Sequence, residues 1–226
     1  MILWKGTELR TKGIIVEKIP DIIKGQKNIK TYDIEGKNGL LVVDKGTYSS
    51  FVCTLDCHFD TEKYTIDSIK EFLDGYGTLS FDGVTEYTAF VKNQIDFEKV
   101  AMFRKFPVQF QVNPISRDIN ATTLTITETP TSVTINSTAN MYPTITLIGN
   151  GDLTITFNNK TFYLYDLDPN LTYTLDCDAK VIVNSNGVNC SNQMKYDFPY
   201  LQKGLNTISY TGTITQFKVD YKKAYI

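Results

Sequence analysis

Histidine is almost absent from this chain of 226 residues, in which His58 is the only one. Mechanisms that need two histidines are therefore excluded, and most metal sites built on imidazole are disfavoured. Cys53, Cys57 and His58 form a short cluster that looks like a set of metal ligands. In a β-strand, however, Cys57 and His58 project to opposite faces, so they cannot easily share an ion or form a nucleophilic pair. We expect His58 to be a half-buried structural residue and the chain to hold no metal.

Long apolar runs and an excess of one charge are also missing. No apolar run reaches the roughly 20 residues that span a bilayer. The N-terminus turns polar at Lys5, without the apolar core of a signal peptide. We therefore expect a soluble protein that is not classically secreted and has no membrane partner. The chain has 23 Lys and Arg residues and 25 Asp and Glu residues, which give a net charge of −2. It therefore lacks the excess of basic residues that is typical of nucleic-acid-binding proteins.

Cysteine is sparse, with four residues in the chain. Cys53 and Cys57 are four residues apart in a predicted strand, a separation of about 13 Å, which is too far for a disulfide. Cys177 and Cys190 could pair if their strands are neighbours. Four reduced thiols in a protein assembled inside a cell are the simpler interpretation.

Catalytic and cofactor motifs are missing as well. Neither G-x-x-x-x-G-K-S/T nor G-x-G-x-x-G occurs, so the sequence predicts no phosphate cradle. Asp166 and Asp168 could form a carboxylate pair for glycoside hydrolysis. Asp168-Pro169-Asn170 is a turn sequence, however, and turn capping is the better interpretation. We expect no enzymatic activity and no cofactor.

What the chain has in abundance is the alternation of β-strands. Apolar residues alternate with threonines in four segments of the C-terminal half, Leu124–Thr127, Val133–Ile135, Ile145–Leu147 and Leu153–Phe157. This pattern is typical of antiparallel sheets with one solvated face. Turn sequences separate the strands at Gly149–Asp152, Asn158-Asn159, Asp168–Asn170 and Asn184–Gly187. The sequence therefore predicts a mainly β protein built as a sandwich or jelly roll.

One segment has helical spacing instead. Ile66, Ile69, Phe72 and Leu73 fall on one face of a helix, Thr65 is a suitable N-cap, and Gly75 follows where a C-terminal cap is expected. We predict a single amphipathic helix from Ile66 to Asp74 that packs on the sheet.

The least hydrophobic stretch, Asn113–Thr122, suggests a division of the chain. It predicts an N-terminal domain of residues 1–115 with strands and the helix, and an all-β C-terminal domain of residues 116–226. We expect the two halves to fold independently.

Aromatic residues are plentiful, with 14 Tyr, 13 Phe and one Trp. Aromatic side chains are favoured on sheets, where they pack in cores and interfaces. Exposed ones could instead form a sugar-binding platform, as in carbohydrate-binding β-sandwiches. Composition alone leaves both interpretations open.

Several segments carry further motifs. They are Ile34–Gly39 with Asp44–Tyr48 and Ile69–Phe81 in the N-terminal half, and Asn136–Pro143, Ile148–Leu153 and Phe198–Ile208 in the C-terminal half. In their order and spacing these segments resemble motifs of the siphophage distal tail protein family, although Phe72 stands where the family usually has Trp. The last of these, Phe-Pro-x-Leu-x-x-Gly-x-Asn-x-Ile, is the most specific. Phe198 and Leu201 can anchor its loop over the sandwich, and Gly204 can turn the chain into a strand that begins near Asn206.

The resemblance implies a tail-tube-like N-terminal β-barrel or sandwich with one α-helix, and a galectin-like C-terminal β-sandwich of the jelly-roll type. It implies a homo-hexameric ring that joins the tail tube protein to the tail-associated baseplate hub protein at the virion tail tip. The tape-measure protein would be a further partner, DNA would pass only in transit, and assembly would take place in the cytoplasm of the bacterial host. The alternative function is a host-glycan-binding module that uses the C-terminal sandwich.

The segment between the early strands is the candidate ring interface. Gly36 and Gly39 flank a two-residue tip, which suits a projecting hairpin. The predicted interface residues are Ile34, Gly36, Lys37, Asn38, Gly39 and Leu40. A channel that lets DNA slide should be acidic or neutral, because Lys and Arg would retain phosphates. Asp33 and Glu35 are candidates for its lining.

Overall fold

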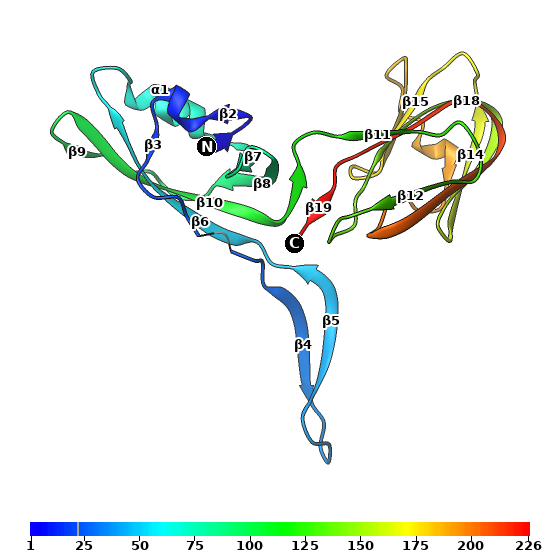
Figure 1. Cartoon of the computed structure of the whole chain (residues 1–226), viewed down its shortest axis with the longest axis horizontal. Helices are drawn as coiled ribbons and strands as arrows, with labels where there is room; N and C mark the ends of the chain where they lie inside the picture. The colour runs from blue at the N-terminus through cyan, green and yellow to red at the C-terminus, as the bar shows by residue number, and fades with distance from the viewer. Residues whose placement is uncertain (22) are drawn as a thin grey trace. The chain divides into compact units, whose positions relative to one another are not determined.

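The computed structural model describes residues 1–21 and 23–226 (Figure 1). Backbone contacts divide the chain into two compact units, Met1–Arg117 with Ile226 and Asp118–Tyr225. The division falls within the predicted linker 113–122, but the first part of this segment is not a loop. Strand β10 (Phe103–Asp118) continues through it, and Ser116 takes a buried position. Independent folding of the units stays a prediction.

Strands dominate the first unit, as the sequence predicted. Besides β10 they are β1 (Leu3–Trp4), β2 (Thr7–Glu8), β3 (Ile15–Val16), β4 (Lys27–Asp33), β5 (Leu40–Tyr48), β6 (Phe51–Asp60), β7 (Tyr76–Ser80), β8 (Thr85–Val91) and β9 (Glu98–Val100). A 3-10 helix spans Leu9–Lys12. The main sheet has the order β2-β1-β7-β8-β10-β6-β3, and β9 also pairs with β10. β4 and β5 form a separate two-stranded sheet.

The core of the first unit lies between this main sheet and helix α1 (Ile66–Leu73). β6 and β10 are antiparallel partners from Phe51 opposite Val112 to Asp60 opposite Phe103, and alternate residues are buried from Cys53 to Phe59 and from Phe106 to Val112. Trp4 is completely buried, with its ring centroid 4.9 Å from that of Phe110. Its indole N–H donates a hydrogen bond to the Phe72 carbonyl oxygen at 3.1 Å, which ties the last turn of α1 to the core.

The helix confirms the prediction almost to the residue. The Thr65 hydroxyl accepts a hydrogen bond from the Ser68 amide at 3.2 Å, which is the bond of an N-cap. Ile69 and Leu73 are buried, and Ile66 and Phe72 pack partly buried against the same core. Gly75 follows at φ +84°, a conformation that glycine adopts without steric cost. No helix in the described part of the chain is both long and apolar enough to cross a membrane.

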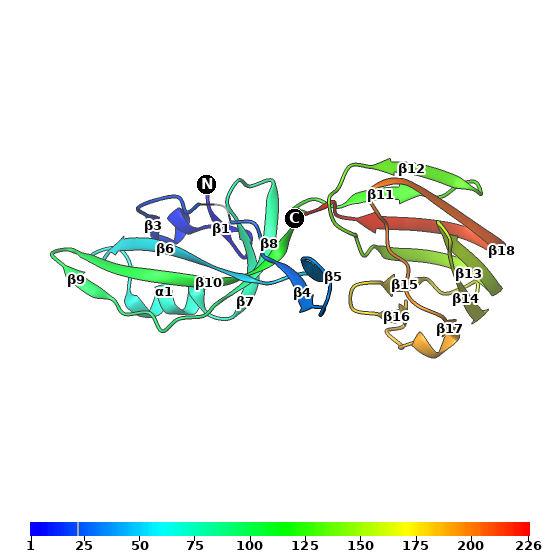
Figure 2. The same ribbon diagram turned by 90° about the horizontal axis from the view of Figure 1, so that it is seen from below.

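Besides its strands, the described part of the second unit contains one 3-10 helix, Ser191–Gln193. The strands are β11 (Thr122–Thr125), β12 (Thr131–Ile135), β13 (Thr144–Phe157), β14 (Lys160–Leu167), β15 (Tyr173–Asp176), β16 (Val181–Asn184), β17 (Met194–Lys195), β18 (Gly204–Tyr221) and β19 (Ala224–Tyr225). β13 and β18 are the longest and pair with each other at the centre (Figure 2). The mainly β architecture with one α-helix is confirmed.

The predicted turn at Gly149–Asp152 is wrong, because β13 runs through it as a bent strand. The first half of β13 pairs with β15 and the second half with β14, and its register with β18 shifts on both sides of Gly149. Gly151 lies at φ +69°, and a Cβ at Gly149 or Gly212 would come within 2.7 Å of the Leu153 side chain. Glycine thus allows a bulge and a close approach of two strands here, the geometry by which strands pass from one layer of a sandwich to the other.

The other predicted turns are confirmed. Asn158-Asn159 form the two-residue loop between β13 and β14, with Asn158 at φ +55°. The Asn184 carbonyl accepts a hydrogen bond from the Gly187 amide at 2.9 Å, which closes the turn at 184–187. Cys177 and Cys190 are both buried free thiols, as are Cys53 and Cys57.

Asn206 explains why the most specific motif of the C-terminal half contains an asparagine. Its side chain is completely buried, and its amide donates to the carbonyl oxygens of Gln202 and Gly204 at 2.8 and 3.0 Å. Its carbonyl oxygen accepts from the Gln202 amide at 2.9 Å and from Asn158 Nδ2 at 3.2 Å. One buried side chain therefore fixes the loop before β18 to the β13–β14 hairpin, while Leu201 anchors that loop in the core.

Replacing Asn206 with Ala should lower the free energy of unfolding by about 3 kcal/mol, because several buried backbone groups lose their partners. Denaturant unfolding followed by circular dichroism measures the loss. The matched control is Asn192→Ala, at an exposed asparagine, which should change the free energy by less than about 0.5 kcal/mol. An equal effect of the two substitutions would show that the Asn206 network does not stabilise the fold.

Candidate functional site

The hairpin of β4 and β5 holds all six residues that the sequence predicted for the ring interface. The Ile34 carbonyl accepts a hydrogen bond from the Lys37 amide at 3.0 Å, which makes a turn with Gly36 at φ +77° in its third position. Gly39 lies at φ +85° and leads into β5. These positive φ angles are the reason for glycine at both places, and they direct Lys37 and Asn38 to the tip. Their role in an interface stays a prediction.

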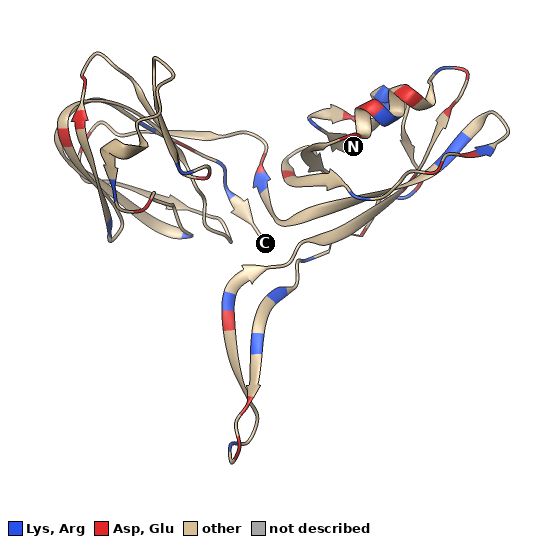
Figure 3. Ribbon diagram, turned by 180° about the vertical axis from the view of Figure 1, so that it is seen from behind, with Lys and Arg blue, Asp and Glu red and all other residues tan. Residues whose placement is uncertain are grey.

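The strands of the hairpin expose apolar side chains on both faces, which the prediction missed. Cross-strand pairing places Tyr32, Leu41 and Val43 on one face of the hairpin, which we call the Tyr32 face. Leu40 and Val42 lie on the opposite face, which we call the Val42 face. These five side chains are between 40 and 59% exposed. In Figure 3 the charged residues of β5 lie toward the base of the hairpin and are followed by an uncharged stretch, whereas β4 also carries a basic residue midway, Lys30, which pairs with Val43. The continuous apolar run Leu40–Val43 was the signal in the sequence, since such runs are typical of strands buried on both faces.

The base of the hairpin is fixed by polar contacts and by one glycine. Lys27 forms an ion pair with Asp44, and this contact raises the pKa of Lys27 and lowers that of Asp44. The Asn28 side chain donates to the Thr47 hydroxyl at 3.0 Å and accepts from the Ser49 hydroxyl at 2.6 Å. Gly25 packs so closely that a Cβ there would lie 2.4 Å from Pro114 Cβ. The close approach to β10 therefore explains why a glycine precedes β4.

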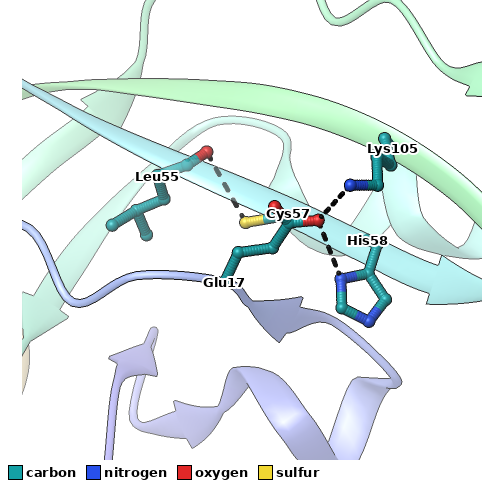
Figure 4. Close-up of polar contacts among 5 residues, drawn as sticks. All are labelled: Glu17, Leu55, Cys57, His58 and Lys105. Carbon is teal, nitrogen blue, oxygen red and sulfur yellow. Dashed lines mark hydrogen bonds and ion pairs between the residues drawn. The ribbon is translucent and has the colours of Figure 1, made fainter.

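The cluster around His58 combines a buried thiol with an ion pair on the opposite face of β6 (Figure 4). Cys57 points into the core and His58 to the opposite face, as predicted, and burial raises the pKa of the Cys57 thiol to about 12. The Glu17 carboxylate accepts a hydrogen bond from Lys105 Nζ at 2.9 Å. His58 Nδ1 lies 3.3 Å from the same oxygen atom, though without the alignment of a hydrogen bond. A protonated, buried thiol is a poor nucleophile, so the arrangement supports no covalent chemistry.

The Asp166–Asp168 pair is also not a catalytic pair. Asp168 Oδ1 accepts hydrogen bonds from the Asn170 amide and side chain, both at 2.9 Å, which is the predicted turn cap. Asp166 lies in the strand β14 at φ +53°, and its amide donates to Asp152 Oδ1 at 3.1 Å. Among the described residues, no group of three His, Cys, Asp or Glu side chains could hold a metal ion.

Comparison with solved structures finds the same fold in a phage protein. The crystal structure of the SPP1 Dit (gp 19.1) protein, a paradigm of the hub adsorption apparatus in phages that infect Gram-positive bacteria, aligns with a TM-score of 0.76. The alignment covers 100% of this chain and 98% of that chain at 13% sequence identity. A chain of the phage p2 baseplate, in its activated conformation with Sr, aligns with a TM-score of 0.44 and 8% identity over 93% of this chain and 90% of that chain. No known sequence family and no curated protein matches the sequence.

Removing the ammonium of Lys105 should raise the pKa of Glu17, because the hydrogen bond from Lys105 is the main cause of its lowered value. NMR titration of the Glu17 carboxyl group in Lys105→Met measures the shift.

The lowered pKa of Glu17 in the folded state also predicts a pH-dependent contribution to stability. This stabilisation is fully present above the ordinary pKa of the carboxyl group, and it is lost as the pH falls through the pKa of the folded state. Glu17→Gln should therefore lower the melting temperature near pH 7 but not at about pH 3, whereas Glu62→Gln, at an exposed residue, should change it at neither pH. A pH-independent effect of Glu17→Gln would contradict the ion pair.

Proposed function

We propose that this chain, which has the fold of a phage distal tail protein, is a non-enzymatic structural subunit of a phage tail tip that assembles into a hexameric ring. The observation that carries the proposal is the β4–β5 hairpin. Its exposed apolar side chains have no place in a monomer in water, since a two-stranded ribbon is at best marginally stable by itself. Another molecule must cover them in the assembled state.

A second copy of the same chain is the partner that fits best. Within the described residues, β4 and β5 pair with each other and with no other strand, so the outer edge of each strand is free for β-pairing. An interface between a hairpin and a different surface of the next subunit is heterologous, and such interfaces close into rings when their rotation fits. The fold match to the SPP1 Dit protein supports a ring of the tail-tip type.

In this ring the first unit forms the closed circle and the second unit decorates it. The ring joins the tail tube protein on one side to the tail-associated baseplate hub protein on the other, near the tape-measure protein. The virion tail tip is its final location, and the cytoplasm of the bacterial host is where it assembles. The sequence resemblance supports these partners, and the SPP1 Dit fold is consistent with them.

Charge substitutions on the hairpin should abolish the ring without unfolding the subunit, because the substituted side chains are already exposed. Two double variants separate the two faces: Leu41→Lys with Val43→Lys on the Tyr32 face, and Leu40→Lys with Val42→Lys on the Val42 face. The stoichiometry is measured by mass photometry and electron microscopy at high protein concentration. At least one double variant should remain monomeric with an unchanged circular dichroism spectrum.

The control is Asn192→Lys, which adds a lysine at an exposed position of the second unit, outside the hairpin, so it should form the wild-type ring. If the wild-type protein shows no cyclic symmetry in the assembled tail, the ring is wrong. If both double variants still form the ring, the ring stands but the hairpin is not its interface.

The channel of the ring should not retain DNA. Each Lys or Arg that contacts a phosphate would strengthen non-specific binding and slow the passage of DNA. We expect Asp33 and Glu35, both exposed near the hairpin tip, to belong to an acidic or neutral lining. The purified ring should show no micromolar binding of duplex DNA at low salt in a fluorescence anisotropy assay. Salt-sensitive binding in that range would contradict a passive conduit.

A further inference from the structure

Three tyrosines gather on the solvent-facing side of the second unit. Tyr163 and Tyr165 project outward from β14, whereas Phe162 and Leu164, which alternate with them along the strand, are buried. The ring planes of Tyr163 and Tyr165 are within 12° of parallel, with their centroids 6.3 Å apart. Tyr196, which follows β17, places its ring centroid 5.6 Å from that of Tyr163. These three residues are named the tyrosine strip.

The backbone at Tyr196 points to a role outside core packing. Its φ is +76°, a left-handed conformation that is rare for a bulky side chain. The conformation brings the ring beside Tyr163 but leaves it 63% exposed, so burial gains little in return. Strained residues of this kind gather at functional sites, where the surrounding structure holds them in place.

Neutral polar groups continue the strip across the sheet. Lys195, Tyr163, Thr154 and Thr211 are direct cross-strand partners on β17, β14, β13 and β18, so their side chains share one face. Aromatic rings, of which those of Tyr163 and Tyr165 are stacked on each other, therefore lie beside a short row of two threonine hydroxyl groups, with a single ammonium at one end. The Lys195 Nζ lies 5.4 Å from the Tyr196 ring centroid.

We propose that the tyrosine strip is a binding site for a neutral oligosaccharide. A sugar ring has an apolar C–H face, which packs on an aromatic ring, and hydroxyl groups at its edge, which both donate and accept hydrogen bonds. The strip and its threonine row offer these two kinds of surface side by side. The site lies wholly within the second unit and does not depend on formation of the ring.

The surroundings of the strip fit a sugar better than a nucleic acid or a protein. Single-stranded nucleic acid also stacks on aromatic residues, but it needs a basic groove for its phosphates. Here Lys195 is accompanied by the exposed carboxylates of Asp166 and Asp197, adjacent in sequence to Tyr165 and Tyr196. Among the large apolar side chains that the described part of the second unit exposes, only Tyr196 belongs to the strip. A protein interface would be expected to have a more apolar centre.

Saturation-transfer difference NMR on the full chain tests the site, with chitotetraose, cellotetraose and maltotetraose as probes. At least one probe should bind, and Tyr163→Thr should weaken it roughly tenfold. Tyr196→Asn should have a similar effect, because asparagine tolerates the left-handed conformation and removes only the ring. The matched control is Tyr142→Ala, at a tyrosine that is 45% exposed and pairs with Tyr200 instead. It should bind like the wild type.

Two further probes cover the other ligands of aromatic surfaces, a short oligothymidine and a polyproline peptide. If none of the three oligosaccharides binds, or if Tyr142→Ala weakens binding as much as the strip variants do, the site is wrong. Loss of oligothymidine or polyproline binding in the strip variants, without sugar binding, would replace the sugar with that ligand class. Circular dichroism of each variant confirms that it is folded.

Discussion

The β4–β5 hairpin exposes apolar side chains on both of its faces, because a two-stranded sheet has no interior in which to bury them. Leu40 to Val43 alternate between its two faces, so no rotation of the ribbon against a single surface of its own subunit could cover all of them. At its base, Gly25 lies against Pro114, and Lys27 pairs with Asp44 across the two strands. The fold of the subunit therefore leaves this apolar surface uncovered.

The longest strands of the two units pair in different ways. In the first, β6 and β10 pair in unbroken register over ten residues on each strand, and α1 covers their buried face. In the second, β13 and β18 bend at glycines and serve both layers of a sandwich. Bent strands let the sheets of a sandwich close on each other.

Local sequence signals predicted the elements whose conformation depends on neighbouring residues. Thr65 and Gly75 marked the ends of α1, and Asn158-Asn159 marked a hairpin, because caps and tight turns are decided by a few adjacent backbone groups. The opposite faces of Cys57 and His58 followed from the period of a strand. The Gly149–Asp152 segment was misread because the same glycines suit a turn or a bulge. Only the partner strand β18, with Gly212 against Leu153, selects the bulge.

The sequence by itself determined the mainly β class, the single helix and the absence of catalytic motifs, since these depend on residue types and short-range spacing. The resemblance in its motifs also indicated the fold that the SPP1 Dit structure shares. The tertiary structure alone decided which apolar residues stay exposed. The run Leu40–Val43 looks like a buried strand in the sequence, and Tyr196 looks like any other core aromatic, yet both are exposed. Burial depends on which strands become neighbours, and that is set by contacts between residues far apart in the chain.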